Sequence, residues 1–319
     1  MKRRRVPMQN RILNTDALSG LAELADSSVD SIVTSPPYWQ MRDYDIGGIQ
    51  WADGWFGQLG LEPTREQYLE HLLSIFDECR RVLKPMGTMW VNLGDSYNNS
   101  QKYSLKPAPQ TISKGNNRNF VYGRTLKSKA SRLPQKSLCN IPGKFADEMI
   151  LRGWILRNEI IWHKPSCVPA SVKDRFTVDF EKLFFFTKQP KYYFNQQFEP
   201  YADSTIGRYR YPMTDRGKSK YYQDVCGTPR GKIEVNPLGR NMRCVWCVPL
   251  ESHKEMHFAM YPTRLVETPI LAGSPEGGIV LDPFAGGGTT LTVAKRLSRQ
   301  YIGIEPNPDY VAICNKRLE

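Results

Sequence analysis

The chain has 319 residues, 40% of them hydrophobic and 24% charged, which is ordinary for a globular protein with a full core. No apolar run approaches the roughly 18–20 residues of a membrane span, and no apolar segment follows the basic start MKRRRVPMQN, which disfavours a membrane protein or a secretory signal and favours the cytoplasm. The net charge of +12 favours a polyanionic partner, for which nucleic acid is the leading candidate.

Short apolar strands and amphipathic helices alternate along the first part of the chain, which indicates a parallel α/β sheet. Strands are expected at Arg11–Asn14, Asp30–Thr34 and Thr88–Leu93. A helix is expected at Arg65–Leu83, where apolar side chains recur at helical spacing and Lys84-Pro85 should end it.

Two polar features follow these strands. Asp30–Thr34 runs into SPPYW, Ser35 to Trp39, whose two prolines can continue neither a strand nor a helix. By itself this is an ordinary way to end a strand. Asp95 follows the third strand, and it could either line a pocket or cap a turn or helix.

Two long segments are strongly basic. Residues 101–140 contain nine Lys or Arg and no acid, and residues 201–243 contain nine against four acids, interleaved with tyrosines. Residues 96–137 read as a long loop, and residues 191–243 as a small recognition module. Such segments suit the phosphates of double-stranded DNA. The expected contacts are Lys102, Lys106, Lys114, Arg118, Arg124, Lys127, Lys129, Arg208, Arg210, Arg216, Lys218 and Lys220.

The second part of the chain continues the α/β pattern. A helix is expected at Pro142–Arg152, strands at Leu156–His163 and Glu181–Lys188, and a further helix at Thr263–Leu271.

The seven cysteines are scattered, which favours reduced thiols over a disulfide framework. Cys244 and Cys247 form the one close pair, and Cys226, His253 and His257 are near enough in sequence to suggest zinc. The spacing of the second ligand pair is wrong for zinc, and the intervening residues Val-Trp are typical of a strand. We therefore favour packing in the core over zinc binding for these cysteines and expect no metal site.

A glycine-rich loop stands near the C-terminus. The strand Gly278–Asp282 leads into DPFAGGGTT, a helix is expected at Thr289–Ser298, and the strand Tyr301–Glu305 ends in an acid before a last helix at Asp309–Lys316. Glycines let the backbone approach a ligand, and an acid after the next strand can accept hydrogen bonds from ribose hydroxyls. The loop matches neither the P-loop nor the dinucleotide fingerprint.

Together these motifs resemble the amino-group DNA methyltransferases. Phe284, Gly286 and Gly288 match the Phe-x-Gly-x-Gly core of that family's cofactor loop, and Ser35 to Tyr38 match its catalytic motif in the form most associated with N4-cytosine enzymes. The range His257–Glu267 resembles the segment that precedes the family's cofactor loop, and Pro165–Lys188 resembles the stretch that precedes its recognition region. The resemblance covers about two thirds of the chain and leaves out 96–137 and 191–243.

The order of the motifs, catalytic first and cofactor last, resembles the circularly permuted β group. It implies a Rossmann-like α/β fold with a mostly parallel seven-stranded sheet, closed by an antiparallel pair, in which the N-terminal strand lies beside Tyr301–Glu305. The implied organisation is a catalytic part at 1–190, a target-recognition region at 191–243 and a cofactor-binding part at 244–319.

The resemblance also implies S-adenosylmethionine as the cofactor. Its binding residues would be Asp16, Thr34, Tyr261, Pro262, Asp282, Phe284, Ala285, Gly286, Gly287, Gly288, Thr289 and Glu305. Ser35 and the Pro36 carbonyl would accept hydrogen bonds from an exocyclic amine, and Pro37 would stiffen the turn. Tyr38 would stack on a base flipped out of the duplex, and Trp39 and Asp95 would extend that pocket.

The expected activity is N4-cytosine methylation of DNA, with a restriction endonuclease as a paired partner. N6-adenine methylation is the nearest competing activity, because some Ser-Pro-Pro-Tyr enzymes act on adenine. Two further hypotheses are a non-catalytic DNA-binding protein of this fold and a methyltransferase that acts on RNA or protein. Methylation at cytosine C5 is disfavoured, since the chain has no Pro-Cys nucleophile.

Overall fold

A central sheet of eight strands organises the part of the chain that the computed structural model describes, which is residues 9–44, 46–98, 133–167, 169–204, 236–251 and 260–319. The strands lie in the order β1-β12-β11-β2-β5-β7-β6-β10. Their bounds are β1 Arg11–Leu13, β2 Val29–Thr34, β5 Leu83–Leu93, β6 Ile155–His163, β7 Phe180–Thr187, β10 Val245–Cys247, β11 Ile279–Asp282 and β12 Gln300–Ile304.

The sheet is parallel except at β7, which pairs antiparallel with β5 on one side and β6 on the other. All seven predicted strands are present. The described sheet has eight strands rather than the expected seven, because β10 pairs in parallel with β6 at the edge of the sheet. This extra strand buries Trp246. The parallel strands end at one edge of the sheet, and β7 begins there, so the loops that carry function should gather at that edge.

Strand β1 pairs in parallel with β12, with Leu13 opposite Ile304. This confirms the predicted neighbourhood of the N-terminal strand and the last strand. It also makes β1 the edge strand next to β12, the strand that Glu305 directly follows.

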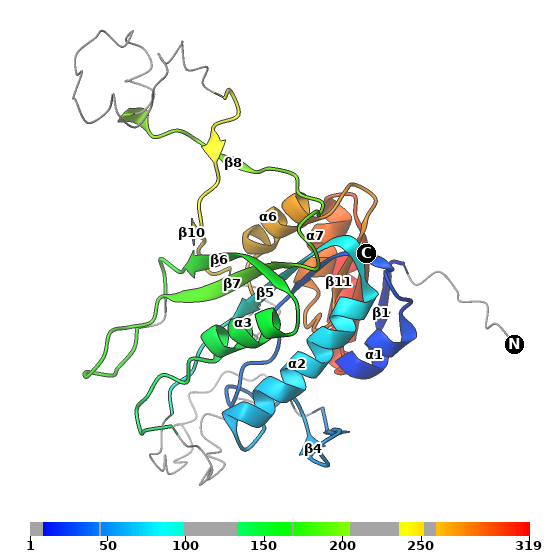
Figure 1. The fold of residues 1–319 in the computed structure, drawn as a ribbon, viewed down its shortest axis with the longest axis vertical. Helices are drawn as coiled ribbons and strands as arrows, with labels where there is room; N and C mark the ends of the chain where they lie inside the picture. Colours follow the sequence, from blue (N-terminus) through cyan, green and yellow to red (C-terminus); the bar gives the residue numbers. More distant parts are fainter. Residues whose placement is uncertain (1–8, 45, 99–132, 168, 205–235, 252–259) are drawn as a thin grey trace, which may run out of the picture. The chain divides into compact units, whose positions relative to one another are not determined.

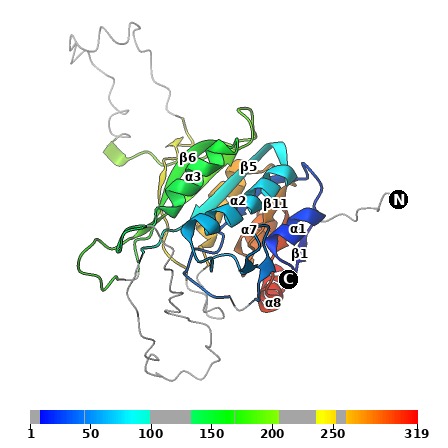
Figure 2. The same cartoon turned by 60° about the horizontal axis from the view of Figure 1, so that its bottom comes forward.

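Helices cover both faces of the sheet (Figures 1 and 2). Those on one face, α1 Ala17–Glu23, α2 Arg65–Val82 and α3 Ile141–Leu151, share one apolar core with the strands. On the other face, α6 Thr263–Gly273 and α7 Thr289–Arg296 pack on β2, β5, β11 and β12, and α8 Pro308–Leu318 packs on α7. Burial of apolar side chains on both faces is the main source of stability for such a sheet.

The five predicted helices are present within two residues of their expected ends. In α2 the Thr64 hydroxyl caps the N-terminus by accepting from the N–H of Gln67, and Tyr68, Leu72 and Phe76 are fully buried. The chain turns directly from α2 into β5 at Leu83, which pairs with Val29, so β5 begins five residues before the predicted Thr88.

Two units are distinguished within the chain, one of residues 1–195 with 244–319 and a smaller one of residues 196–243. In the described part of the smaller unit, β8 Phe198–Glu199 pairs with β9 Arg240–Asn241, and Glu199 forms ion pairs with Arg240 and Arg243. A short hairpin in the larger unit is formed by β3 Ile49–Gln50 and β4 Phe56–Gly57. Among the described residues, none of the helices combines the length and the hydropathy of a membrane span.

Candidate active site

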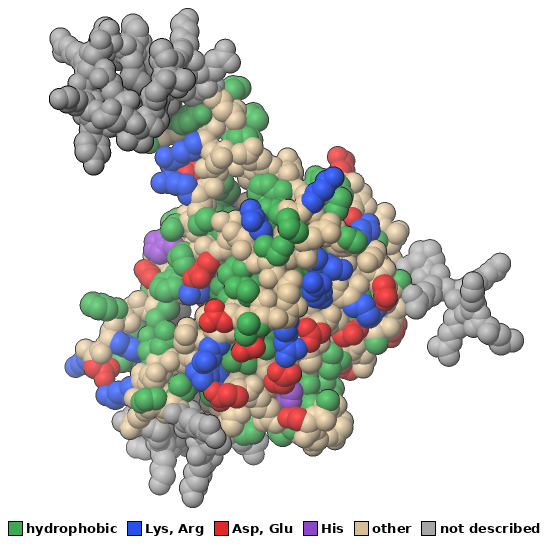
Figure 3. Space-filling model, in the orientation of Figure 1, with side chains coloured by type: hydrophobic (Ala, Val, Ile, Leu, Met, Phe, Trp, Pro, Cys, Tyr) green, Lys and Arg blue, Asp and Glu red, His purple; other side chains and the backbone are tan. Residues whose placement is uncertain are grey.

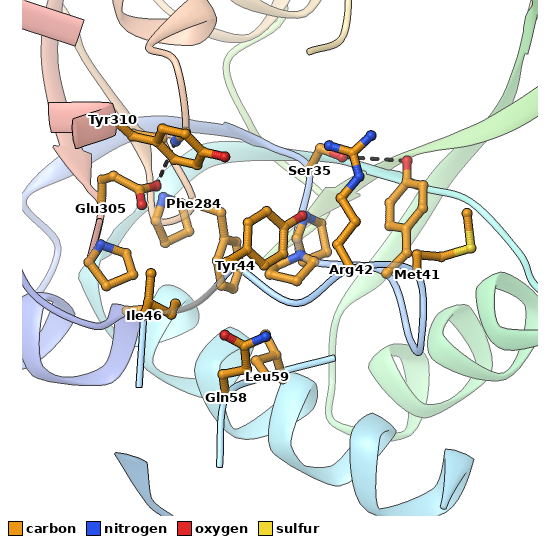
Figure 4. A pocket seen from close by; sticks show the side chains of 18 of the residues that line it. Ser35, Met41, Arg42, Tyr44, Ile46, Gln58, Leu59, Phe284, Glu305 and Tyr310 are labelled. Carbon is orange, nitrogen blue, oxygen red and sulfur yellow. Dashed lines mark hydrogen bonds between the residues drawn. The ribbon is translucent and has the colours of Figure 1, made fainter. Parts of the chain in front are cut away.

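A cavity of about 340 Å³ opens at the edge of the sheet where the parallel strands end (Figure 4). It has room for a nucleoside-sized ligand. Twelve predicted site residues line it: Asp16, Ser35, Pro36, Pro37, Tyr38, Tyr261, Phe284, Ala285, Gly286, Gly287, Thr289 and Glu305. In Figure 4, Glu305 and Tyr310 lie on one side of the cavity and Ser35 and Arg42 on the other, with Phe284 and Tyr44 between them.

The glycine loop joins β11 to α7 in a backbone conformation that needs glycine. Gly286 and Gly288 have φ of +49° and +78°, in the left-handed region. A Cβ on Gly288 would lie 2.6 Å from the sulfur of Cys314, whose thiol donates a hydrogen bond to the Gly286 carbonyl at 3.0 Å. The α8 cysteine therefore packs against the back of the loop.

Asp282 fixes the start of this loop from inside the protein. It is almost completely buried, and burial raises the pKa of its carboxyl above the usual value. Four donors surround its two oxygens: the hydroxyls of Thr34 at 2.6 Å, Thr290 at 2.7 Å and Tyr261 at 3.1 Å, and the N–H of Phe284 at 3.0 Å. Four of the residues predicted to bind the cofactor do not line the cavity, so they would contribute by holding its walls in place. They are Thr34, Pro262, Asp282 and Gly288.

Glu305 presents a carboxylate to the cavity directly after β12. Its oxygens accept hydrogen bonds from the N–H groups of Gly286 at 2.8 Å and Asn307 at 2.9 Å. The residue is 7% exposed, and burial raises the pKa of the carboxyl to about 7. An acid of this kind, beside a glycine loop, fits the hydroxyls of a ribose.

Asp16 stands at the start of α1 and also lines the cavity. Its side chain caps that helix by accepting from the N–H of Ser19 at 2.9 Å. With Phe284, Glu305 and the backbone of the glycine loop, it completes a set of residues that fits an adenosine-containing cofactor. The predicted hydrogen bond from adenine to Asp16 stays a prediction.

The diproline forms the other end of the cavity. Its turn is held from behind, because the buried Tyr68 hydroxyl of α2 donates to the Pro37 carbonyl at 2.8 Å. Ser35, Pro36 and Tyr38 all line the cavity. The Ser35 hydroxyl is 3.5 Å from that of Tyr38, the dashed contact beside Ser35 in Figure 4.

A polar cluster that we did not predict surrounds the Tyr38 hydroxyl. Tyr38 donates to Glu181 at 2.6 Å, Asn92 donates to Tyr38 at 2.8 Å and to Glu181 at 2.7 Å, and Lys164 forms an ion pair with Glu181. Burial and the Glu181 charge raise the pKa of Tyr38 well above its usual value. A signal existed in the sequence: Asn92 interrupts an apolar strand, and Lys164 and Glu181 stand at strand ends.

The structure corrects two weaker expectations. Trp39 does not extend the base pocket, because its ring is 3% exposed in the core and its Nε1 donates to the Glu62 carbonyl at 2.9 Å. Asp95 does not line the cavity either. Its Oδ1 accepts from the N–H groups of Ser96 and Ile141, which makes it a cap for the start of α3, the second of the two roles expected for it.

The segment after the diproline supplies cavity residues that carried no motif. Arg42, Tyr44 and Ile46 lead into the β3–β4 hairpin, and Tyr310 from α8 faces them (Figure 4). Burial raises the pKa of both tyrosines. Residues of this kind are positioned by tertiary contacts, so a pattern in one sequence does not reveal them.

All twelve predicted DNA contacts, from Lys102 to Lys220, lie outside the described residues. On the face of the molecule in Figure 3, the described Lys and Arg side chains are interspersed with Asp and Glu. Cys244 and Cys247 are exposed, so the expectation that they pack in the core is wrong. The other zinc candidates, Cys226, His253 and His257, lie outside the described residues as well. Within the described ranges, no cluster of three or more His, Cys, Asp or Glu could hold a metal ion.

A family model described as DNA methylase matches residues 29–316. The chain belongs to this DNA methylase family. It is 37% identical to the type II methyltransferase M.Cfr9I of Citrobacter freundii, over 95% of this chain and 86% of the relative. It is 33% identical to the type II methyltransferase M.SmaI of Serratia marcescens, over 97% of this chain and 90% of the relative.

Solved structures agree on the fold of this DNA methylase. The PvuII DNA methyltransferase (cytosine-N4-specific) matches with a TM-score of 0.61 at 18% identity, covering 98% of this chain and 86% of that one. M1.HpyAVI, solved as a complex with SAM, matches with a TM-score of 0.52 at 18% identity, covering 97% and 98%. The predicted methyltransferase fold is thereby confirmed.

Proposed function

We propose that this DNA methylase is the modification enzyme of a type II restriction-modification system, and that it transfers a methyl group from S-adenosylmethionine to the N4 amine of cytosine in double-stranded DNA. The observation that carries the proposal is the shared cavity. Ser35, Pro36 and Tyr38 at one end face the same space as Phe284, the glycine loop and Glu305 at the other.

The residues around the cavity fit S-adenosylmethionine. When bound, this cofactor supplies a methyl group activated by its positively charged sulfur. Glu305 would accept hydrogen bonds from the ribose, Phe284 and Asp16 would lie beside the adenine, and the backbone of residues 285–288 would follow the rest of the molecule. Because each of these groups is held by the fold before any ligand binds, little ordering is left to the binding step.

The diproline end suits an exocyclic amine. The lone pair of such an amine is delocalised into the base, so the site must aim it at the methyl group. Ser35 Oγ and the Pro36 carbonyl are two acceptors that can bind the two N–H groups and stabilise positive charge developing on nitrogen. The Tyr38 ring supplies a stacking face for a base flipped from the duplex.

Ser35 favours cytosine over adenine, because the serine form of this motif resembles N4-cytosine enzymes. The family model and the type II relatives support amino-group methylation of DNA without deciding between the two bases. The smaller unit and the basic segments would read the recognition sequence and contact phosphates. A restriction endonuclease with the same recognition sequence would be the functional partner.

Nucleoside analysis tests the proposal directly. Unmethylated duplex DNA is incubated with the protein and labelled cofactor, digested to nucleosides and separated by mass, with the Ser35→Ala variant as the control. We expect N4-methylcytosine, and much less of it with the control. Recovery of N6-methyladenine alone would overturn the choice of base. Cofactor binding with label transfer only to RNA or protein, or to no substrate, would overturn the proposal as a whole.

A further inference from the structure

A chain of three hydrogen-bonding groups runs from the catalytic serine into the protein. Ser35 Oγ donates toward Tyr38 Oη at 3.5 Å, and Tyr38 Oη donates to Glu181 Oε2 at 2.6 Å. Glu181 lies at the start of β7, the one strand of the described sheet that begins where the parallel strands end. Ser35 and Tyr38 belong to the diproline segment, Glu181 comes from a strand 143 positions after Tyr38, and the three meet at the wall of one cavity.

The far end of this chain can only accept. An ionised carboxylate has no proton to give, and the groups around Glu181 are all donors: the Tyr38 hydroxyl, the Asn92 amide and the Lys164 ammonium. Glu181 also fixes the amide of Asn92, since a flipped amide would place its oxygen against Oε2. The Tyr38 hydroxyl therefore donates its proton to Glu181 and to no other group.

The hydrogen bond from Tyr38 to Glu181 sets the direction of the hydrogen bonds that Tyr38 and Ser35 make on the cavity side. With its proton on Glu181, the Tyr38 oxygen can only accept, and it accepts from Asn92 at 2.8 Å and from Ser35. The proton of Ser35 is thus drawn away from the cavity. The lone pairs of Ser35 are left to accept an N–H from the substrate amine.

We propose that Glu181 is a positioning residue for methyl transfer, which acts through Tyr38 to hold the Ser35 hydroxyl as an acceptor for the amine. This inference rests on the proposed function, because it requires an exocyclic amine as substrate, and it applies equally to cytosine and adenine. Without the Glu181 carboxylate, the Ser35 hydroxyl would be free to turn its own proton toward the amine, and this proton would repel the N–H groups of the substrate.

The surroundings of Glu181 differ from those of an ordinary surface ion pair. On the same two strands, Lys182 forms an ion pair with Glu159 at 2.6 Å, and both of those side chains are more exposed than their counterparts in the Glu181–Lys164 pair. Lys164 also lies over the Trp162 ring, 4.4 Å from its centroid. Enclosing an ion pair costs solvation, so a pair used only for stability gains little from this position.

A double-mutant cycle of Glu181→Gln and Tyr38→Phe tests the inference. In the Glu181→Gln variant, the Lys164 ammonium can only donate, so it donates to the oxygen of the new amide. This turns the amide NH₂ toward Tyr38 and reverses the chain. Tyr38→Phe keeps the ring but removes the hydroxyl that transmits the effect. Glu159→Gln is the matched control, because it removes a carboxylate of the same size from an ion pair on the same strands.

The measurements are the single-turnover rate of methyl transfer to DNA and the Kd values for cofactor and DNA. We expect Glu181→Gln and Tyr38→Phe each to slow transfer by about 10²-fold, with both Kd values within about twofold of wild type. The double variant should be no slower than either single variant, because both changes break the same chain. Glu159→Gln should transfer at the wild-type rate.

Two results would overturn the inference. Multiplicative effects in the double variant would mean that Glu181 does not act through Tyr38, and a Glu181→Gln variant that changes only Kd or thermal stability would mean a structural role. The proposed function is judged separately, on the wild-type protein in the same assay. If wild type methylates no exocyclic amine, the proposed function fails before the variants are compared.

Discussion

The hydroxyl of Thr34 donates to Oδ1 of Asp282 at 2.6 Å, which ties the residue before the diproline motif to the residue before the glycine loop. The two residues are 248 positions apart in sequence, and their strands β2 and β11 are neighbours in the sheet. The two ends of the cavity therefore share one buried carboxylate. A shift of either motif would move the other, so this contact holds the two ends of the cavity at a constant distance.

Asp282→Ala should lower the free energy of unfolding by about 2–4 kcal/mol, because it removes the carboxylate that accepts from four donors, and the Thr290 hydroxyl is left with only its second acceptor, the Val33 carbonyl. Asp282→Asn should cost under about 1 kcal/mol. Its oxygen can face the N–H of Phe284, which has no freedom to turn, while the hydroxyls of Thr290 and Tyr261 rotate to accept from the new NH₂. Urea unfolding followed by circular dichroism measures both. Equal losses in the two variants would contradict this account of the site.

Much of the fold could be predicted from the sequence because its signals are local. Strand and helix positions follow from apolar periodicity, and the pairing of β1 with β12 follows from the order of the motifs. The short helix α1 and the two-residue strands were missed, since their lengths leave too few residues to show a period. The only sequence signal for β10 was Val245 and Trp246, two residues typical of strands, between Cys244 and Cys247.

The site residues that could be predicted from the sequence are likewise those that stand in contiguous motifs. The glycine loop, the diproline and Glu305 are contiguous motifs whose spacing carries meaning, and the structure brings them to one cavity. The Asn92, Lys164 and Glu181 cluster is assembled from β5, β7 and the residue directly after β6, so its members are neighbours only after folding. Trp39 was misassigned for the converse reason: adjacency to Tyr38 in sequence says nothing about which way a ring points.

Ser35→Ala should slow methyl transfer by about 10²-fold or more and leave cofactor affinity unchanged, because Ser35 lies at the end of the cavity away from Glu305. Glu305→Ala should show the reverse pattern, with a weaker cofactor Kd as its chief effect. Isothermal titration with S-adenosylmethionine and single-turnover assays with DNA separate the two. An equal loss of cofactor affinity in both variants would contradict this division of roles.

The affinity for S-adenosylmethionine should rise with pH between 6 and 8. Burial raises the pKa of the Glu305 carboxyl to about 7, and the ionised form is the better acceptor for ribose hydroxyls. About one tenth of the carboxyl is ionised at pH 6 and about nine tenths at pH 8, so the Kd should be about tenfold weaker at pH 6. Glu305→Gln should bind more weakly and lose this pH dependence, whereas the exposed Glu276→Gln should retain it. A wild-type Kd that is constant over this range would count against Glu305 as the ribose acceptor.

The same pKa gives the sign of a stability effect in the cofactor-free protein. The folded state favours the neutral carboxyl, since its pKa is raised from the ordinary 4.5. The free energy of unfolding should therefore fall as pH rises from about 4.5 to about 7, on the order of 3 kcal/mol from this group alone. The slope should be reduced in Glu305→Gln, which has no charge to bury.

Gly288→Ala should destabilise the protein more than Gly286→Ala. Both positions have positive φ, which costs an alanine about 1 kcal/mol. At Gly288 the new methyl group would also lie 2.6 Å from the sulfur of Cys314, whereas the nearest atom to a Cβ on Gly286 is 3.9 Å away. Thermal unfolding of the two variants measures the difference, with Gly277→Ala as a control at positive φ in open space.

The second substitution Cys314→Ala distinguishes the clash from the backbone strain. Cys314→Ala alone removes the thiol that donates to the Gly286 carbonyl, so it should be mildly destabilising. Combined with Gly288→Ala it removes the sulfur that the new methyl group meets, and the double variant should be more stable than the sum of the single effects predicts. Gly286→Ala combined with Cys314→Ala should show a smaller coupling, because no clash is relieved there. Strict additivity in the Gly288 pair would mean that α8 does not pack against the loop as described.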